Sequence, residues 1–101
     1  MNVVILAGKI SSAPVIEKGS PYQSSVAHMN VSVQRSFQNQ DGDYDSDEFE
    51  VWLWKGMGEE IIAHFEATER VLIRGRLQVK DGKVVVIAET VSLISEKKPE
   101  A

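Results

Sequence analysis

The segment FEVWLWK, residues 49–55, decides how the rest of the chain is interpreted. Its positions alternate with the two-residue period of a β-strand that has one buried face. Phe49, Val51 and Leu53 share one face, and both tryptophans, Trp52 and Trp54, fall on the opposite face beside Glu50. A packed tryptophan buries roughly 150–250 Å², so two of them on a charged face predict a platform for a flat apolar partner such as a nucleobase.

Two further β patterns precede this segment. Residues 3–7 (VVILA) form a continuous apolar run short enough for a strand, and Gly8 follows at a position suited to a sharp bend. The strand resumes at residues 9–10, and the sequence SSAP at 11–14 predicts that it breaks there. After an expected loop over residues 17–25, with a turn at 19–21, residues 27–37 alternate as a half-buried strand.

The chain turns at two predicted tips and contains one helical pattern. Asp41-Gly42 predicts a hairpin tip within the polar, acidic residues 38–47, and Asp81-Gly82 predicts a two-residue turn. Residues 57–67 switch to helical spacing. The expected core positions of that helix are Met57, Ile61, Ile62 and Phe65.

Two more strands complete the pattern, over residues 71–80 and 84–94, the second interrupted near Glu89. Five strands with one helix between the third and fourth are the arrangement of the OB-fold, an all-β Greek-key barrel. Gly8 and Gly75 stand where closing such a barrel requires strong strand curvature. We expect one OB-fold domain over residues 1–95 and a short polar tail over residues 96–101.

The composition bounds the class of protein. With 101 residues, 43% apolar and 26% charged, the chain predicts one soluble globular domain. No apolar run approaches the ~20 residues that span a bilayer, and no basic region precedes the first apolar run as in a secretory signal. Cysteine is absent, which excludes disulfides and is compatible with the cytoplasm. The net charge of −4 counts against a nucleic-acid binder unless cations gather on one surface.

Several segments resemble bacterial and phage single-stranded DNA-binding proteins. They are residues 1–10 (MNVVILAGKI), 31–37 (VSVQRSF), 39–42 (NQDG), 54–56 (WKG) and 74–78 (RGRLQ). The likeness extends over nearly all of residues 1–94, in the order and spacing of that family. It implies an OB-fold, a homo-oligomer (a tetramer in preference to a dimer) and sequence-independent binding of single-stranded DNA without catalysis.

The resemblance also implies candidate DNA-binding residues. The base-stacking aromatics of the family fall at Phe37 and Trp54, and Trp52 shares the face of Trp54. The contacts to the DNA backbone fall on basic and polar residues of several segments: Lys9, Arg35, Lys55, Arg74, Arg76, Gln78 and Lys80.

Three features depart from the family pattern. Glu48 and Glu50 occupy positions where the family more often has an aromatic or basic residue, and the turn after Lys80 is minimal. The chain ends in SEKKPEA at residues 95–101, without the acidic, aromatic-ended tail through which such proteins recruit replication partners. Contacts with replication or recombination proteins are therefore in doubt even if the chain binds DNA.

The residues themselves support a binding path along the fourth strand. By the two-residue period, Arg74, Arg76, Gln78 and Lys80 share one face. Three cations on one ridge could each neutralise a phosphate and release its counterions. The alternative is an ordinary solvated barrel face.

The aromatic candidates also have structural alternatives. Trp54 could pack against a partner subunit instead of stacking on a base. For Trp52, an interface or core role is as plausible as stacking. Phe37 could close the rim of the barrel.

No catalytic or metal site is expected. The acids at positions 41, 43, 45 and 47 alternate as at the start of an EF-hand loop, but Ser46 and Trp52 stand where that loop requires glycine and glutamate. His28 and His64 have no metal-ligand spacing. No catalytic triad or phosphate-cradling loop can be assembled. We expect a protein that needs no cofactor and is not an enzyme.

We interpret the chain as an OB-fold protein of the cytoplasm that coats and protects single-stranded DNA in replication, recombination or repair. The main alternative is an OB-fold adaptor of the primosomal type, which acts mainly through protein–protein contacts and would explain the negative charge. A barrel subunit of an enzyme, inactive alone, is the third interpretation.

Overall fold

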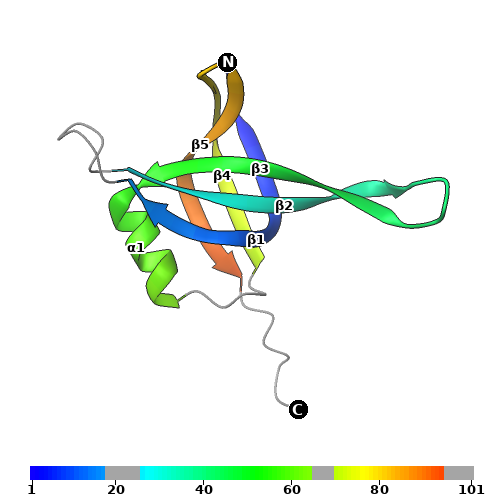
Figure 1. Ribbon diagram of the computed structural model, residues 1–101, viewed down its shortest axis with the longest axis horizontal. Helices are drawn as coiled ribbons and strands as arrows, with labels where there is room; N and C mark the ends of the chain where they lie inside the picture. The colour runs from blue at the N-terminus through cyan, green and yellow to red at the C-terminus, as the bar shows by residue number, and fades with distance from the viewer. Residues whose placement is uncertain (18–25, 65–69, 95–101) are drawn as a thin grey trace, which may run out of the picture.

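A computed structural model describes residues 1–17, 26–64 and 70–94 (Figure 1). The expected turn at residues 19–21, the core role of Phe65 and the helix end near Ala67 lie outside these residues. So does the expected polar tail over residues 96–101. Among the described residues, no helix is long and apolar enough to cross a membrane.

Five strands close into a barrel with the neighbour order β1-β2-β3-β5-β4, in which β4 pairs back onto β1. The one described helix lies between β3 and β4 in the chain and covers one end of the barrel (Figure 1). This is the OB-fold that the order of elements predicts. The elements are β1 (Val4–Ile16), β2 (Val26–Gln38), β3 (Tyr44–Trp54), α1 (Lys55–His64), β4 (Arg70–Lys80) and β5 (Lys83–Ile94).

The core follows from the alternation of the strands. In the antiparallel pair of β2 and β3, Met29 lies opposite Val51 and Ala27 opposite Leu53, so the apolar faces of both strands point into the barrel together. All four are buried, as are Ile10, Val31, Ile61, Val71, Ile73, Val86 and Ala88.

Strand β1 is longer than expected. The predicted break at residues 11–14 is wrong, because β1 continues to Ile16 in partnership with β2. The register shifts between Ile10 and Ser12 and again between Ser12 and Val15. These irregularities admit Pro14, because a proline is tolerated where the ladder of hydrogen bonds is interrupted.

Two glycines mark close approaches between strands. A Cβ atom on Gly8 would meet the carbonyl oxygen of Ser32, and one on Gly75 would meet the carbonyl oxygen of Ile87. Opposite Gly75 the register shifts, so that Glu89 has no direct partner on β4. The predicted interruption near Glu89 is therefore confirmed, and it is a bulge within one continuous strand.

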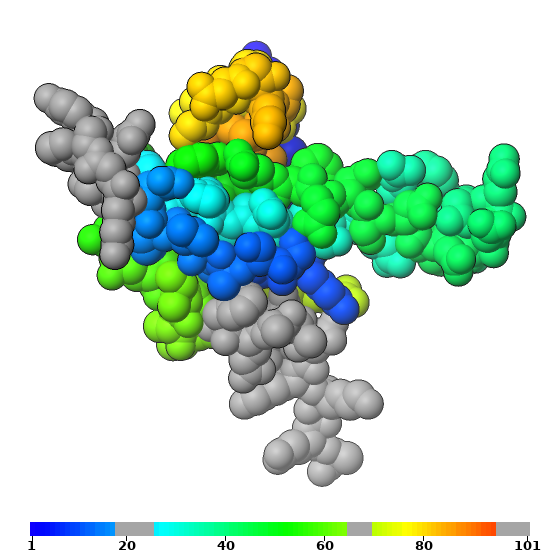
Figure 2. Space-filling model, viewed as in Figure 1, coloured from blue at the N-terminus to red at the C-terminus, as the bar shows by residue number. Residues whose placement is uncertain are grey.

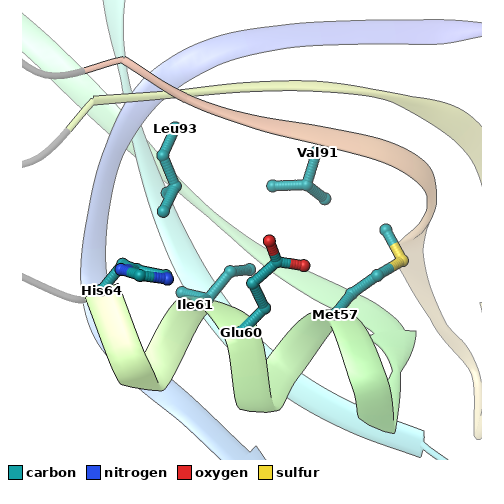
Figure 3. Close-up of a pocket in the computed structure, with 6 residues that line it drawn as sticks. All are labelled: Met57, Glu60, Ile61, His64, Val91 and Leu93. Atoms are coloured by element: carbon teal, nitrogen blue, oxygen red, sulfur yellow. The ribbon is translucent and has the colours of Figure 1, made fainter.

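Helix α1 packs on the barrel through fewer residues than expected. Ile61 is buried and Met57 packs against the core, but Ile62 is 46% exposed, so its predicted core position is wrong. Successive helical residues are about 100° apart around the helix axis. Because the side chain of Ile61 faces the barrel, that of Ile62 points away from it. A cavity of about 160 Å³ remains between α1 and β5 (Figure 3), lined by Met57, Glu60, Ile61, His64, Val91 and Leu93.

Two hairpins extend from the barrel (Figure 1). In the β2–β3 arm, Gln34 lies opposite Ser46 and Gln38 lies opposite Tyr44, with a register shift between these two pairs. The tip of the arm lies at the predicted Asp41-Gly42. The β4–β5 hairpin closes at Asp81 and Gly82, whose φ angles are 51° and 79°. Two consecutive positive φ angles are typical of a type I′ turn, which confirms the predicted two-residue connection.

Gly75→Ala should lower the free energy of unfolding by about 1–3 kcal/mol, because the added methyl group must displace the backbone of β5. Denaturation in guanidinium chloride would measure the change. Gly56→Ala is the matched control, since no atom lies within 4 Å of a Cβ at that helical position, and it should leave stability unchanged or slightly higher. Equal stability of both variants and the parent would refute the close approach.

Candidate nucleic-acid interface

A groove of about 260 Å³ opens on the outer surface between β3 and β4, with β5 beneath it. Figure 2 shows β3 running directly below the β4–β5 hairpin, while the tip of the β2–β3 arm lies far from that hairpin. The groove has an apolar floor, two aromatic residues and three long polar side chains. Its lining consists of Val26, Trp52, Leu53, Trp54, Arg76, Gln78, Lys80, Ile87 and Ala88.

The strand register explains why aromatic and basic residues meet here. Trp52 lies opposite Ile87 where β3 and β5 run in parallel, and Ile87 lies opposite Arg76 in the antiparallel pair of β5 and β4. The outward face of Ile87 is thus flanked by Trp52 on one side and Arg76 on the other. Residues that are two positions further along these strands continue the same face.

Trp54 presents an open aromatic surface. It is the last residue of β3, opposite Val26 at the start of β2, and helix α1 begins immediately after it. Trp54 is 63% exposed, although large hydrophobic residues are usually buried. An exposed indole at the mouth of a groove can stack on a planar partner without first moving another residue.

Trp52 is half-buried and has defined neighbours. Its indole Nε1 donates a hydrogen bond to Glu50 Oε2 at 2.9 Å. The ring of His28, opposite on β2, lies 4.9 Å from the Trp52 ring between centroids, and His28 Nε2 is 2.7 Å from Glu17 Oε1. The ammonium nitrogen of Lys80 lies 3.2 Å from the Trp52 ring centroid.

Only part of the predicted row of basic and polar residues on β4 lines the groove. Arg76, Gln78 and Lys80 line the groove, and Arg76 Nη2 donates to Gln78 Oε1 at 3.3 Å. Arg74 lies on the same exposed face of β4, but outside the groove lining. Lys55 opens helix α1 with an exposed side chain and is also outside the lining.

The remaining candidates lie elsewhere on the barrel. Lys9 borders a separate depression of about 780 Å³ together with Ser11, Gln34 and Glu48. Phe37 is 65% exposed on the β2–β3 arm. The structure brings five of the ten candidate residues together in the groove and separates the other five from it.

Arg35 is engaged by acids of its own hairpin. Its Nε and Nη2 donate to the two carboxylate oxygens of Asp47 at 3.0 and 2.8 Å, and Nη1 lies 3.9 Å from Asp45 Oδ2. Hydrogen bonding and attraction to Asp47 raise the pKa of Arg35, and the hydrogen bond from Arg35 lowers the pKa of Asp47. This bidentate contact occupies the Nε–Nη2 edge of the guanidinium, one of the edges through which an arginine binds a phosphate.

Sequence reasoning missed the floor of the groove. Val26 and Ile87 belong to it, and so does the supporting ring of His28 behind Trp52. The period of β5 places Ile87 on the outward face, but only the pairing of β5 with both β3 and β4 brings it into the groove. Long-range pairing of this kind leaves no local signal in the sequence.

The groove combines what binding to an unpaired nucleic-acid strand requires. An aromatic face accepts a base, cations accept the backbone, and an apolar floor excludes water without reading any base edge. Within residues 1–17, 26–64 and 70–94, no three histidine, aspartate or glutamate side chains gather to hold a metal ion.

Comparisons with known proteins show the family to which the chain is related. A family model described as the single-strand binding protein family matches residues 1–93. The single-stranded DNA-binding protein of Aquifex aeolicus is 31% identical over 97% of this chain and 73% of its own length. That of Oceanobacillus iheyensis is 29% identical over 91% of this chain and 60% of its own length.

Solved structures share the fold. Wild-type single-stranded DNA binding protein from Thermus aquaticus superposes with a TM-score of 0.73 at 22% identity, covering 96% of this chain and 52% of that one. The small single-stranded DNA-binding protein from Streptomyces coelicolor gives a TM-score of 0.69 at 15% identity and covers 89% of both chains. The chain spans 60% and 56% of the relatives from Oceanobacillus iheyensis and Bacillus cereus.

Arg35→Gln should raise the pKa of Asp47 toward that of a free aspartate, because it removes the hydrogen bond that stabilises the carboxylate. Since the folded-state pKa of Asp47 lies below the unfolded value, the bond favours folding at neutral pH. Its contribution disappears as the pH falls through the folded-state pKa. A carboxyl-detected NMR titration of the variant and the parent under the same conditions would measure the shift. An unchanged pKa of Asp47 would show that the pair does not form in solution.

Proposed function

The chain belongs to the single-strand binding protein family, and we propose that it binds single-stranded DNA without sequence preference. In this proposal it protects the unpaired strand in the cytoplasm during replication, recombination or repair. The role is one of binding without catalysis. The observation that carries the proposal is the exposed indole of Trp54 in one groove with Arg76 and Lys80.

In the proposed binding mode, the aromatic side chain contacts a base and the polar side chains contact the phosphates. A base stacks on Trp54, for which stacking contributes about 1–3 kcal/mol per base. The flanking phosphates lie along Arg76, Gln78 and Lys80. Stacking and charge neutralisation act on every base alike, which supports sequence-independent binding.

The strand would enter and leave this groove along neighbouring parts of the barrel. Arg74 continues the cationic face of β4, and Lys55 follows Trp54 directly. Lys9, Arg35 and Phe37 are the more distant members of the proposed path, for a strand that wraps further around the barrel. Arg35 would contact a phosphate only in competition with Asp47.

The negative net charge is compatible with this proposal because the charges are unevenly distributed. Four of the acids, at positions 41, 43, 45 and 47, lie on the β2–β3 arm, away from the groove. The groove itself contains two cations and no carboxylate among its lining residues. The carboxylate of Glu50 contacts the lining residue Trp52, so it acts on a bound phosphate together with the two cations, within the screening length of about 10 Å at 0.1 M salt.

We also propose that the protein forms a homo-oligomer, a tetramer in preference to a dimer. Several exposed apolar side chains just before β1, on β1 and on the β4–β5 hairpin support this, since they would be covered in an assembly. They are Val3, Ile5, Leu72, Leu77, Val79 and Val84. The same side chains favour the second candidate function, an adaptor of the primosomal type whose main ligands are proteins.

A salt titration of binding to fluorescent oligo(dT) separates the two functions. A DNA-coating protein should bind tightly at low salt and lose affinity steeply as salt rises, because each neutralised phosphate of a single strand contributes about 0.7 to the slope. Light scattering on the same samples gives the oligomeric state. Weak binding with a shallow slope would favour the adaptor.

Trp54→Ala should weaken oligo(dT) binding about tenfold while leaving the salt slope and the oligomeric state unchanged, because it removes a stacking face and no charge. Ile62→Ala is the control, an exposed apolar side chain on α1 outside the groove and outside the proposed path, and it should bind as the parent does. If Trp54→Ala binds DNA normally but dissociates into monomers, Trp54 belongs to a subunit interface.

A further inference from the structure

The two tryptophans of the groove are not equivalent. Trp54 is open, whereas the Lys80 ammonium nitrogen lies 3.2 Å from the centroid of the Trp52 ring. A cation within about 6 Å of a ring centroid is attracted by the negative face of the aromatic system. A base stacked on that face would need the space that Lys80 fills.

The ring of Trp52 is oriented before any ligand arrives. Glu50 accepts the hydrogen bond from its indole nitrogen, and the His28 ring packs 4.9 Å away between centroids. His28 comes from β2, on one side of β3, while Lys80 comes from β4, beyond the other side. The carboxylate and the two neighbouring side chains fix the indole independently of DNA.

Lys80 needs such a contact to have a defined position. It is the last residue of β4, directly before the turn at Asp81 and Gly82, so its backbone is held by a tight hairpin. Its four-carbon side chain would otherwise sample many rotamers, as free lysines do. The contact with Trp52 fixes the ammonium in the groove beside Arg76.

We propose that Trp52 is a positioning residue that holds the Lys80 ammonium in the groove as a phosphate-binding cation, and that it is not a second base-stacking platform. The ligand of this subsite is the phosphate next to the base stacked on Trp54. An ammonium has three donors, and those that do not face the ring are free to bind phosphate oxygens. The inference rests on the proposed binding of single-stranded DNA.

A double-mutant cycle on oligo(dT) affinity tests this assignment. Lys80→Gln should weaken binding about fivefold or more in the parent, but less than about twofold in Trp52→Leu, because coupled residues give non-additive effects. Trp52→Phe, which keeps an aromatic face for the cation, should retain most of the affinity. Lys83→Gln is the control, since it removes one charge at the other end of the same turn and outside the groove lining.

Fluorescence gives a second test that does not depend on Lys80. In Trp54→Phe the one remaining indole is Trp52, and saturating oligo(dT) should leave most of its emission unquenched. Strong quenching, together with independent effects of Lys80→Gln and Trp52→Leu, would overturn the inference while leaving DNA binding intact.

The contact itself is measurable without DNA. In the free protein, the ring of Trp52 should shift the ε-methylene protons of Lys80 upfield in the NMR spectrum, and Trp52→Leu should return them to ordinary values. Unshifted protons in the parent would refute the inference. A parent protein that shows this shift and yet fails to bind oligo(dT) would refute the proposed function, and the phosphate role with it.

Discussion

The parallel contact between β3 and β5 is the constraint on which the proposed interface depends. It joins Val51 to Val86 and Trp52 to Ile87, and it closes the barrel between the two hairpins. The first of these pairs is buried in the core. The second pair faces outward, and Ile87 of this pair also lies opposite Arg76 on β4. One register therefore buries an apolar pair inside and aligns an aromatic, an apolar and a basic side chain outside.

Much of this arrangement is predictable because strands have a short, regular period. The alternation in residues 49–55 assigns both tryptophans to the outward face, and the order of elements gives the OB-fold. The continuation of β1 through Pro14 was not predictable, because the bulges that admit the proline depend on the partner strand. The exposure of Ile62 likewise depends on how α1 rotates against the barrel.

The site was predictable only in part. Sequence period groups Arg74 with Arg76 and Lys80, but the depth and extent of the groove depend on β5, which leaves Arg74 outside its lining. The pairing of Arg35 with Asp47 connects residues 12 positions apart across the β2–β3 arm. The contact between Lys80 on β4 and Trp52 on β3 reaches across β5, which lies between these strands. Each of these depends on pairing between strands, which a pattern within one strand does not encode.

In the proposed complex, single-stranded DNA occupies the groove between Trp54 and Arg76. Amide and indole NMR spectra recorded during a titration with short oligo(dT) would show whether it does. The largest shifts should fall on Trp54, Arg76 and Ile87, while residues of the depression beside Lys9 and Glu48 should shift little. Shifts concentrated around that depression, with the signals of Trp54 unmoved at saturation, would contradict it.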